Sequence, residues 1–321
     1  MTVRDFLKRV NAKTIDYPAR IEAYAHDDRV LNRALGIIPF LYFFLLFESF
    51  RIAANWKLAS PLSESRFHPI WTIGWASYVS FDHVVALICG LFLVGMLIGS
   101  LFYMHRAARV IAFLALFEYH AFMSSFGAPE HNIVSFIYPL LFCIFLPDVW
   151  EKKETTFLER KTFLIGFIGI QTYLGLIYSL AGIGKVVRGI EQLISGQANF
   201  LSPDAFALHI AYWLPATGSD SLFGPYIVAH PLAGWPLFLG TLYFQVFTLW
   251  AIFKPSLHWI WGVFLVSFYI LNFLIMNIFF VDVFFLIAAL FLYSPFDAVQ
   301  IRWKDRLADL PLFGPLFRLI K

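Results

Sequence analysis

Residues 162–186 read TFLIGFIGIQTYLGLIYSLAGIGKV, an apolar stretch that ends close to a lysine. Its length and composition match what a helix needs to cross the hydrocarbon core of a bilayer. The rest of the chain has the same character, since 60% of its 321 residues are hydrophobic and 14% are charged. A soluble domain carries about 25% charged residues. The sequence therefore predicts a polytopic membrane protein.

One face of this stretch is polar and lined by small residues. Gln171, Tyr178 and Lys185 recur at intervals of seven, so a helix places them on one side. Gly175, Ala181 and Gly182 lie near them, and small residues let helices approach closely in membranes. We expect this face to point into a helix bundle.

Apolar windows of about 17 to 25 residues predict roughly eight transmembrane helices and an all-α fold. The expected spans are 34–50, 83–104, 108–126, 132–149, 162–186, 235–253, 257–273 and 277–294. The chain then divides into an amphipathic, basic segment at 1–33, a transmembrane domain at 34–294 and a basic tail at 295–321. Without a cleavable signal pattern at the start, the first span is expected to direct membrane insertion.

Basic residues orient these spans. With the N-terminus in the cytoplasm, nineteen of the 24 Lys and Arg residues fall on the inner side and five on the outer side. This asymmetry follows the positive-inside bias. We expect an inner or plasma membrane protein with both termini in the cytoplasm and Lys185 at the outer face.

Two outer segments, 51–82 and 188–234, are long and rich in aromatic residues. Aromatic side chains favour the headgroup level of the bilayer. We expect short interfacial helices there that cover the bundle on its outer side.

The sequence argues against several other classes of site. Cys89 and Cys143 both fall within spans and lack metal-type spacing, which favours buried apolar roles and predicts no metal site. We find no nucleotide-binding glycine motif. The net charge of +3 is explained by the inner loops, so no nucleic-acid partner is expected.

Lys185 has two interpretations. Its stem can lie in apolar surroundings while the ammonium reaches the headgroups, which would make it an anchor. Alternatively, the small residues before it press this face into the bundle, where a lysine can act as a base.

Three further polar residues are candidates for a ligand site. Glu118 lies near the centre of a span, where it is either a structural hydrogen-bonding group or a functional one. His131 and Asn132 begin the fourth span on the outer side. Asn132 can cap that helix, and His131, at the level of Lys185, can relay a proton from the amine.

Two motifs resemble a known family. The run from Gln171 to Lys185 is similar to the segment that carries the base lysine in vitamin K-dependent gamma-carboxylases, whose membrane part belongs to the horizontally transferred transmembrane (HTTM) domain family. Glu130-His131-Asn132 and the later Leu146-Pro147-Asp148-Val149-Trp150 resemble that family's Asn-His motif and the helix after it. The resemblance extends over residues 33–293.

The resemblance implies a specific chemistry. Lys185 would deprotonate a naphthoquinol, meaning reduced menaquinone or vitamin K, with His131 holding the lysine in its active state. Tyr178 and Gln171 would line the route to the amine, and Asn132 and Glu118 would contribute to ligand binding. The chain lacks the large lumenal region of the carboxylases and the His and Gln of their late-helix motif, as 274–279 retains the asparagine alone.

Two functions from different classes remain open. The first is a quinol-dependent carboxylase-like enzyme or oxidoreductase. The second is a non-catalytic membrane factor that matures or assembles a secreted peptide, as some short bacterial members of the family are thought to do. Its partners would be that peptide or a small membrane protein, and the bilayer itself is expected in both cases.

Overall fold

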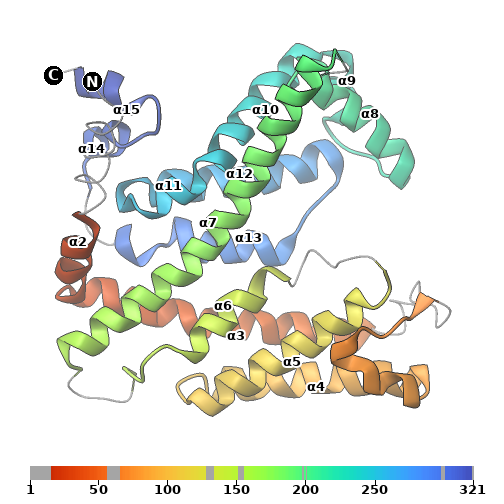
Figure 1. Cartoon of the computed structure of the whole chain (residues 1–321), viewed down its shortest axis with the longest axis vertical. Coiled ribbons are helices and arrows are strands. Elements are labelled where there is room, and N and C mark those ends of the chain that lie inside the picture. The colour runs from red at the N-terminus through yellow and green to blue at the C-terminus, as the bar shows by residue number, and fades with distance from the viewer. Residues whose placement is uncertain are drawn as a thin grey trace. The chain divides into compact units, whose positions relative to one another are not determined.

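The structure is a computed structural model. It describes residues 16–55, 66–127, 134–150, 155–196, 199, 201–297 and 301–319. Throughout these ranges the ordered elements are helices, which confirms the predicted all-α fold. The chain forms two compact units, Met1–Ile170 and Gln171–Lys321 (Figure 1).

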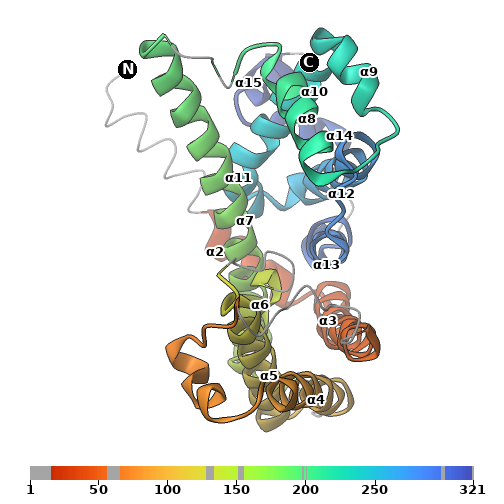
Figure 2. The same cartoon turned by 90° about the vertical axis from the view of Figure 1, so that its right-hand side faces the viewer.

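The first unit is built from helices, most of which are long and apolar. They are α2 (Asp16–Ala25), α3 (Asp28–Asn55), α4 (Phe81–Leu101), α5 (Arg106–Ser124), α6 (Val134–Ile144) and the first part of α7 (Phe157–Ile194). The helices α4 and α5 lie side by side in Figures 1 and 2. Gly95 and Gly99 of α4 face Ala115 and Ala112 of α5, so the backbones come close where side chains are small.

Ion pairs attach α2 and the start of α3 to the first turn of α7. The Lys161 ammonium donates to the Glu22 carboxylate at 2.7 Å, and Arg160 pairs with Asp28. The helix α3 begins at Asp28, so it includes residues 28–33, which had been expected to precede the first span.

A buried arginine joins α5 to the residues that follow α6. Arg109 is fully buried in α5, and its Nη2 donates to Asp148 at 2.7 Å, just after α6. The Trp150 ring lies 5.2 Å from the Arg109 guanidinium carbon. The Leu146–Trp150 motif therefore supplies an anion and an aromatic face to a buried cation.

The second unit continues from Gln171 of α7. It contains α8 (Ala205–Thr217), α9 (Gly224–Ala229), α10 (Pro231–Val246), α11 (Thr248–Ile252), α12 (His258–Met276), α13 (Val281–Ile287), a π-helical turn at Ala288–Leu292, α14 (Trp303–Ala308) and α15 (Gly314–Leu319), with 3₁₀ turns at Pro255–Leu257 and Pro295–Asp297. Figure 2 shows α8 and α9 beside α10.

The small-residue face of α7 packs against the junction between α10 and α11. A Cβ on Gly182 would lie 2.6 Å from the Val246 nitrogen, and one on Gly175 would lie 2.0 Å from the Ile252 Cδ1 atom. The Ser179 hydroxyl accepts a hydrogen bond from the Leu249 backbone nitrogen at 2.9 Å. Ala181, expected on this face, is exposed instead.

Five helices in the described ranges are long and apolar enough to cross a membrane, which supports a membrane protein. These are Asp28–Ala54, Phe81–Leu101, Arg106–Ser124, Phe157–Ile194 and Pro255–Met276. The other three expected spans form shorter pieces. The one at 132–149 contains α6, that at 235–253 is divided into α10 and α11 at Phe247, and that at 277–294 is α13 and the π turn.

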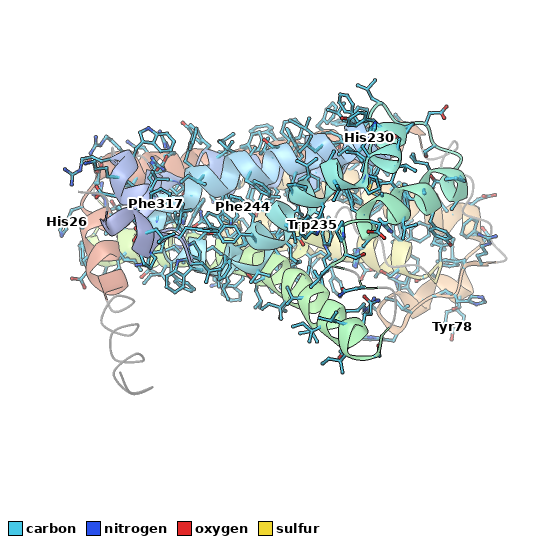
Figure 3. The ribbon with its side chains drawn as sticks, turned by 90° about the horizontal axis from the view of Figure 1, so that it is seen from above. His26, Tyr78, His230, Trp235, Phe244 and Phe317 are labelled. Carbon is cyan, nitrogen blue, oxygen red and sulfur yellow. The ribbon has the colours of Figure 1, made fainter. Side chains whose placement is uncertain are left out.

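Short helices occur in both expected outer segments. The segment 51–82 contains a 3₁₀ helix, η2 (Trp71–Tyr78), and 188–234 contains α8 and α9. Tyr78 is 90% exposed and extends from the surface in Figure 3. The expected tail at 295–321 is partly folded, because Arg306 of α14 is buried and pairs with Asp297 at 2.7 Å.

Candidate functional site

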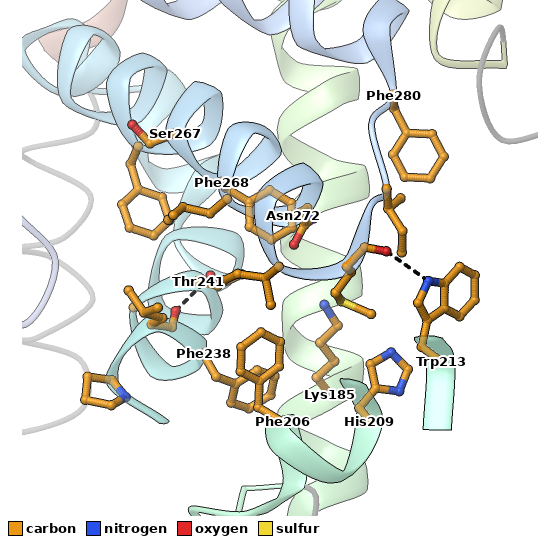
Figure 4. Close-up of a pocket in the computed structure, with 18 residues that line it drawn as sticks. Lys185, Phe206, His209, Trp213, Phe238, Thr241, Ser267, Phe268, Asn272 and Phe280 are labelled. Atoms are coloured by element: carbon orange, nitrogen blue, oxygen red, sulfur yellow. Dashed lines mark hydrogen bonds between the residues drawn. The ribbon is translucent and has the colours of Figure 1, made fainter. Parts of the chain in front are cut away.

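The second unit encloses a cavity of about 390 Å³ between α7, α8, α10 and α12 (Figure 4). Its walls are mainly apolar, and one of the aromatic rings in them is Phe280, which precedes α13. The other rings that line it are Phe206, Trp213, Phe238, Phe264 and Phe268. Such a site suits a flat, apolar ligand of small-molecule size.

Lys185 contributes the amine of this cavity. Its side chain is half-buried, and Nζ donates to the Gln245 Oε1 atom at 2.8 Å. Gln245 is 5% exposed and lies in the last turn of α10. Gly182 makes this contact possible, because its missing side chain lets α10 approach α7 one turn before Lys185.

The remaining polar groups come from three other helices. His209 of α8 is exposed to the outside and also lines the cavity, where Figure 4 shows it beside the Lys185 stem. Asn272 and Ser267 of α12 complete the lining, while the Thr241 hydroxyl already donates to Leu237. No carboxylate belongs to the cavity wall in the described part of the chain. The partner of the amine is thus a neutral amide.

Two sets of contacts with the end of α12 hold the helix α8 over the cavity. Ala207 and Ile210 pack into an apolar cluster with Ile275 and Met276 at the end of α12. The Trp213 indole nitrogen donates to the Met276 carbonyl at 3.2 Å, a bond drawn in Figure 4. Phe206, His209 and Trp213 follow helical spacing and form the cavity-facing side.

Tyr178 and Gln171 lie deeper in the second unit than Lys185. The Gln171 amide nitrogen donates to the Leu290 carbonyl at 2.6 Å, and the hydroxyls of Tyr178 and Tyr269 contact each other. Both residues share the inward face of α7, as their spacing predicts, but neither belongs to the cavity wall.

The other candidate residues are not part of the cavity wall that the structure describes. Glu118 belongs to the first unit, where its side chain is hydrogen-bonded to Trp75 of η2 and its Oε2 atom has no partner among the described residues. His131 and Asn132 fall outside the residues that the structure describes.

Two polar residues of the site, the Lys185 partner Gln245 and the cavity residue His209, were not identified from the sequence. Gln245 is the one side-chain amide in the expected span 235–253, which was a usable signal for a buried polar contact. His209 precedes Trp213 by one helical turn inside a segment read only as an aromatic cover.

The described residues include no group of three or more His, Cys, Asp or Glu that could hold a metal ion. Cys89 and Cys143 are buried free thiols, in agreement with their expected apolar roles.

The chain has the helices of an integral membrane protein. Comparisons with protein-family models, with curated proteins and with solved structures found no match to this chain.

Proposed function

We propose that this chain is an integral membrane protein that binds a quinol in the cavity of its second unit and removes a proton from it with Lys185. The observation that supports this proposal is the position of the amine. Lys185 Nζ lies in the wall of an aromatic cavity of about 390 Å³ and bonds to the neutral amide of Gln245.

The cavity residues fit a naphthoquinol. Its rings are flat and apolar, and they match the aromatic side chains of Phe206, Phe238 and Phe268 in the cavity wall. A quinol also carries ring hydroxyls, which need polar partners, and Lys185 and Asn272 provide them. When bound, such a cofactor supplies two electrons and acidic hydroxyl groups.

Lys185 performs the proton transfer. The Gln245 carbonyl oxygen accepts one N–H of the amine and so fixes its position. The nitrogen lone pair then takes the hydroxyl proton of the ligand, so that an N–H bond forms as the O–H bond breaks. The α8 helix is held beside the cavity by the hydrogen bond from Trp213 to the Met276 carbonyl.

The HTTM resemblance suggests the class of reaction in this proposal. With a base lysine acting on a naphthoquinol, the chain would be a carboxylase-like enzyme or an oxidoreductase. The proposal rests on Lys185 and no longer requires His131, which lies outside the described residues.

A naphthol probe tests this proposal without knowledge of the second substrate. 1-Naphthol carries one ring hydroxyl, and its ionised form absorbs at longer wavelength. We expect the purified protein to bind and ionise this probe at neutral pH, and Lys185→Met to bind it without ionisation. Binding with equal ionisation by both proteins would overturn the role of Lys185.

A non-catalytic role in maturing a secreted peptide is supported by a different observation. The outer side of α8 and α9 exposes Leu208, Tyr212 and Tyr226, each more than half accessible. These side chains offer an apolar peptide a binding surface while Lys185 serves as an anchor. In that case Lys185→Met would retain cellular function, whereas Tyr212→Ser would lose it.

A further inference from the structure

We propose that His209 is the proton-exchange group of the cavity, carrying the proton that Lys185 removes to the outside. This inference rests on the proposed function and extends it to a residue of α8. In the described part of the chain, Lys185 and His209 are the two ionisable residues of the cavity wall.

The position of His209 suits this role. Lys185 is half-buried, while His209 lines the same cavity and is also exposed. One imidazole nitrogen can therefore receive a proton from inside as the other releases one to water. Figure 4 shows the two side chains entering the cavity from different helices, α7 and α8.

Lys185 needs a second group that takes over the proton it has removed. After it has taken a proton, Lys185 is an ammonium whose hydrogen-bond partner, Gln245, is neutral and cannot accept the proton. Phe206 and Trp213, on either side of His209 along α8, are apolar or donor-only groups. His209 is the remaining ionisable group in the described cavity wall.

The transfer is balanced. The ammonium N–H bond breaks and an N–H bond forms on the His209 imidazole, either directly or through one bridging water. The imidazolium then gives a proton to outside water or buffer. Lys185 returns to a free amine, and no electrons are exchanged.

Apart from Lys185, the other ionisable groups near His209 do not line the cavity in the described part of the chain. The helices α9 and α10, which pack against α8, contain no charged residues. The helix α12 also packs against α8 and carries His258, whose ring is hydrogen-bonded to Ser294 and to the Ile252 carbonyl. Asp204 and Asp220 lie beyond the two ends of α8, and His230 lies at the start of α10, where it packs on Tyr226. None of the three belongs to the cavity wall.

The experiment measures how fast bound 1-naphthol is ionised after a pH jump in stopped flow. His209→Gln should bind and ionise the probe to the wild-type extent at equilibrium, because Lys185 is unchanged. It should do so at least about tenfold more slowly, since positioned acid–base groups contribute that much or more. Added imidazole should restore the rate. His230→Gln, a histidine outside the cavity, is the matched control.

The outcomes separate the two proposals. If the wild type does not ionise the probe, the proposed function fails. If the wild type ionises it and His209→Gln does so equally fast, or stays slow with imidazole present, the role of His209 is overturned while that of Lys185 stands. Because His209 is exposed, the substitution should leave folding unchanged.

Discussion

Lys185 and Gln245 join α7 to α10 by a 2.8 Å hydrogen bond at the wall of an aromatic cavity. The contact depends on Gly182, one turn before Lys185, where a Cβ would meet the Val246 backbone nitrogen. Packing and chemistry are therefore coupled in this part of α7.

The first prediction concerns that glycine. Gly182→Ala should lower the free energy of unfolding by about 1 to 3 kcal/mol, because an overpacked backbone contact cannot relax easily. Gly184→Ala is the control, as it has open space around it and should change stability by less than about 1 kcal/mol. Denaturation in mixed micelles measures both. Equal losses would contradict the close approach of α10.

The second prediction concerns the partner of the amine. Gln245→Glu should leave the protein folded but abolish ionisation of 1-naphthol, because a carboxylate holds Lys185 as a paired ammonium. Gln245→Leu should still ionise 1-naphthol, although the Lys185 amine is held in place less firmly without its hydrogen bond. Absorbance of the bound probe distinguishes the two variants, and full activity of Gln245→Glu would show that the amide is not the functional partner.

The third prediction concerns the buried arginine of the first unit. Asp148→Ala should destabilise the protein by about 1 to 3 kcal/mol, because it leaves the Arg109 guanidinium buried without its anion. The loss stays moderate since the Asp148 side chain is 58% exposed and water can reach the site. Thermal unfolding in detergent measures it. Asp305→Ala, which removes a surface pair with Arg302, should have little effect.

The fourth prediction concerns pH. The hydrogen bond from Lys161 holds the pKa of Glu22 below its usual value of 4.5. A lowered pKa in the folded state contributes stability above pH 4.5, and this contribution is lost as the pH falls through the folded value. Hydrogen exchange of α2, corrected for intrinsic rates, should accelerate in acid.

The control for this effect is Glu22→Gln, which removes the ionisable group but keeps its size. In this variant the acid-dependent increase in α2 exchange should be smaller than in the wild type. The same acceleration in both proteins would show that the pair with Lys161 does not attach α2 to α7.

The sequence predicted the parts of the fold that follow from composition and periodicity. The α7 stripe shows this, since Gln171, Tyr178 and Gly182 are all buried as their spacing requires. Spacing alone could not place Ala181, because a shift of one position turns a side chain by about 100°. Ser179 packs in this region and bonds to Leu249.

Tertiary contacts decided what the sequence could not. The expected span 235–253 is interrupted at Phe247, and the Ser179 hydroxyl from α7 satisfies the Leu249 nitrogen there. No local signal in the apolar run marks this break. For the same reason the sequence identified Lys185 but not His209, which reaches the cavity only because α8 folds back over α12.

The most direct measurement of the central claim is organic extraction of the purified protein followed by mass spectrometry for a quinone. We predict that wild type from quinone-containing membranes retains one, and that Ser267→Trp, which fills the cavity, loses it. Ile270→Trp, exposed on α12 and outside the cavity wall, should retain it. A wild type without quinone, or equal retention by Ser267→Trp, would contradict the account.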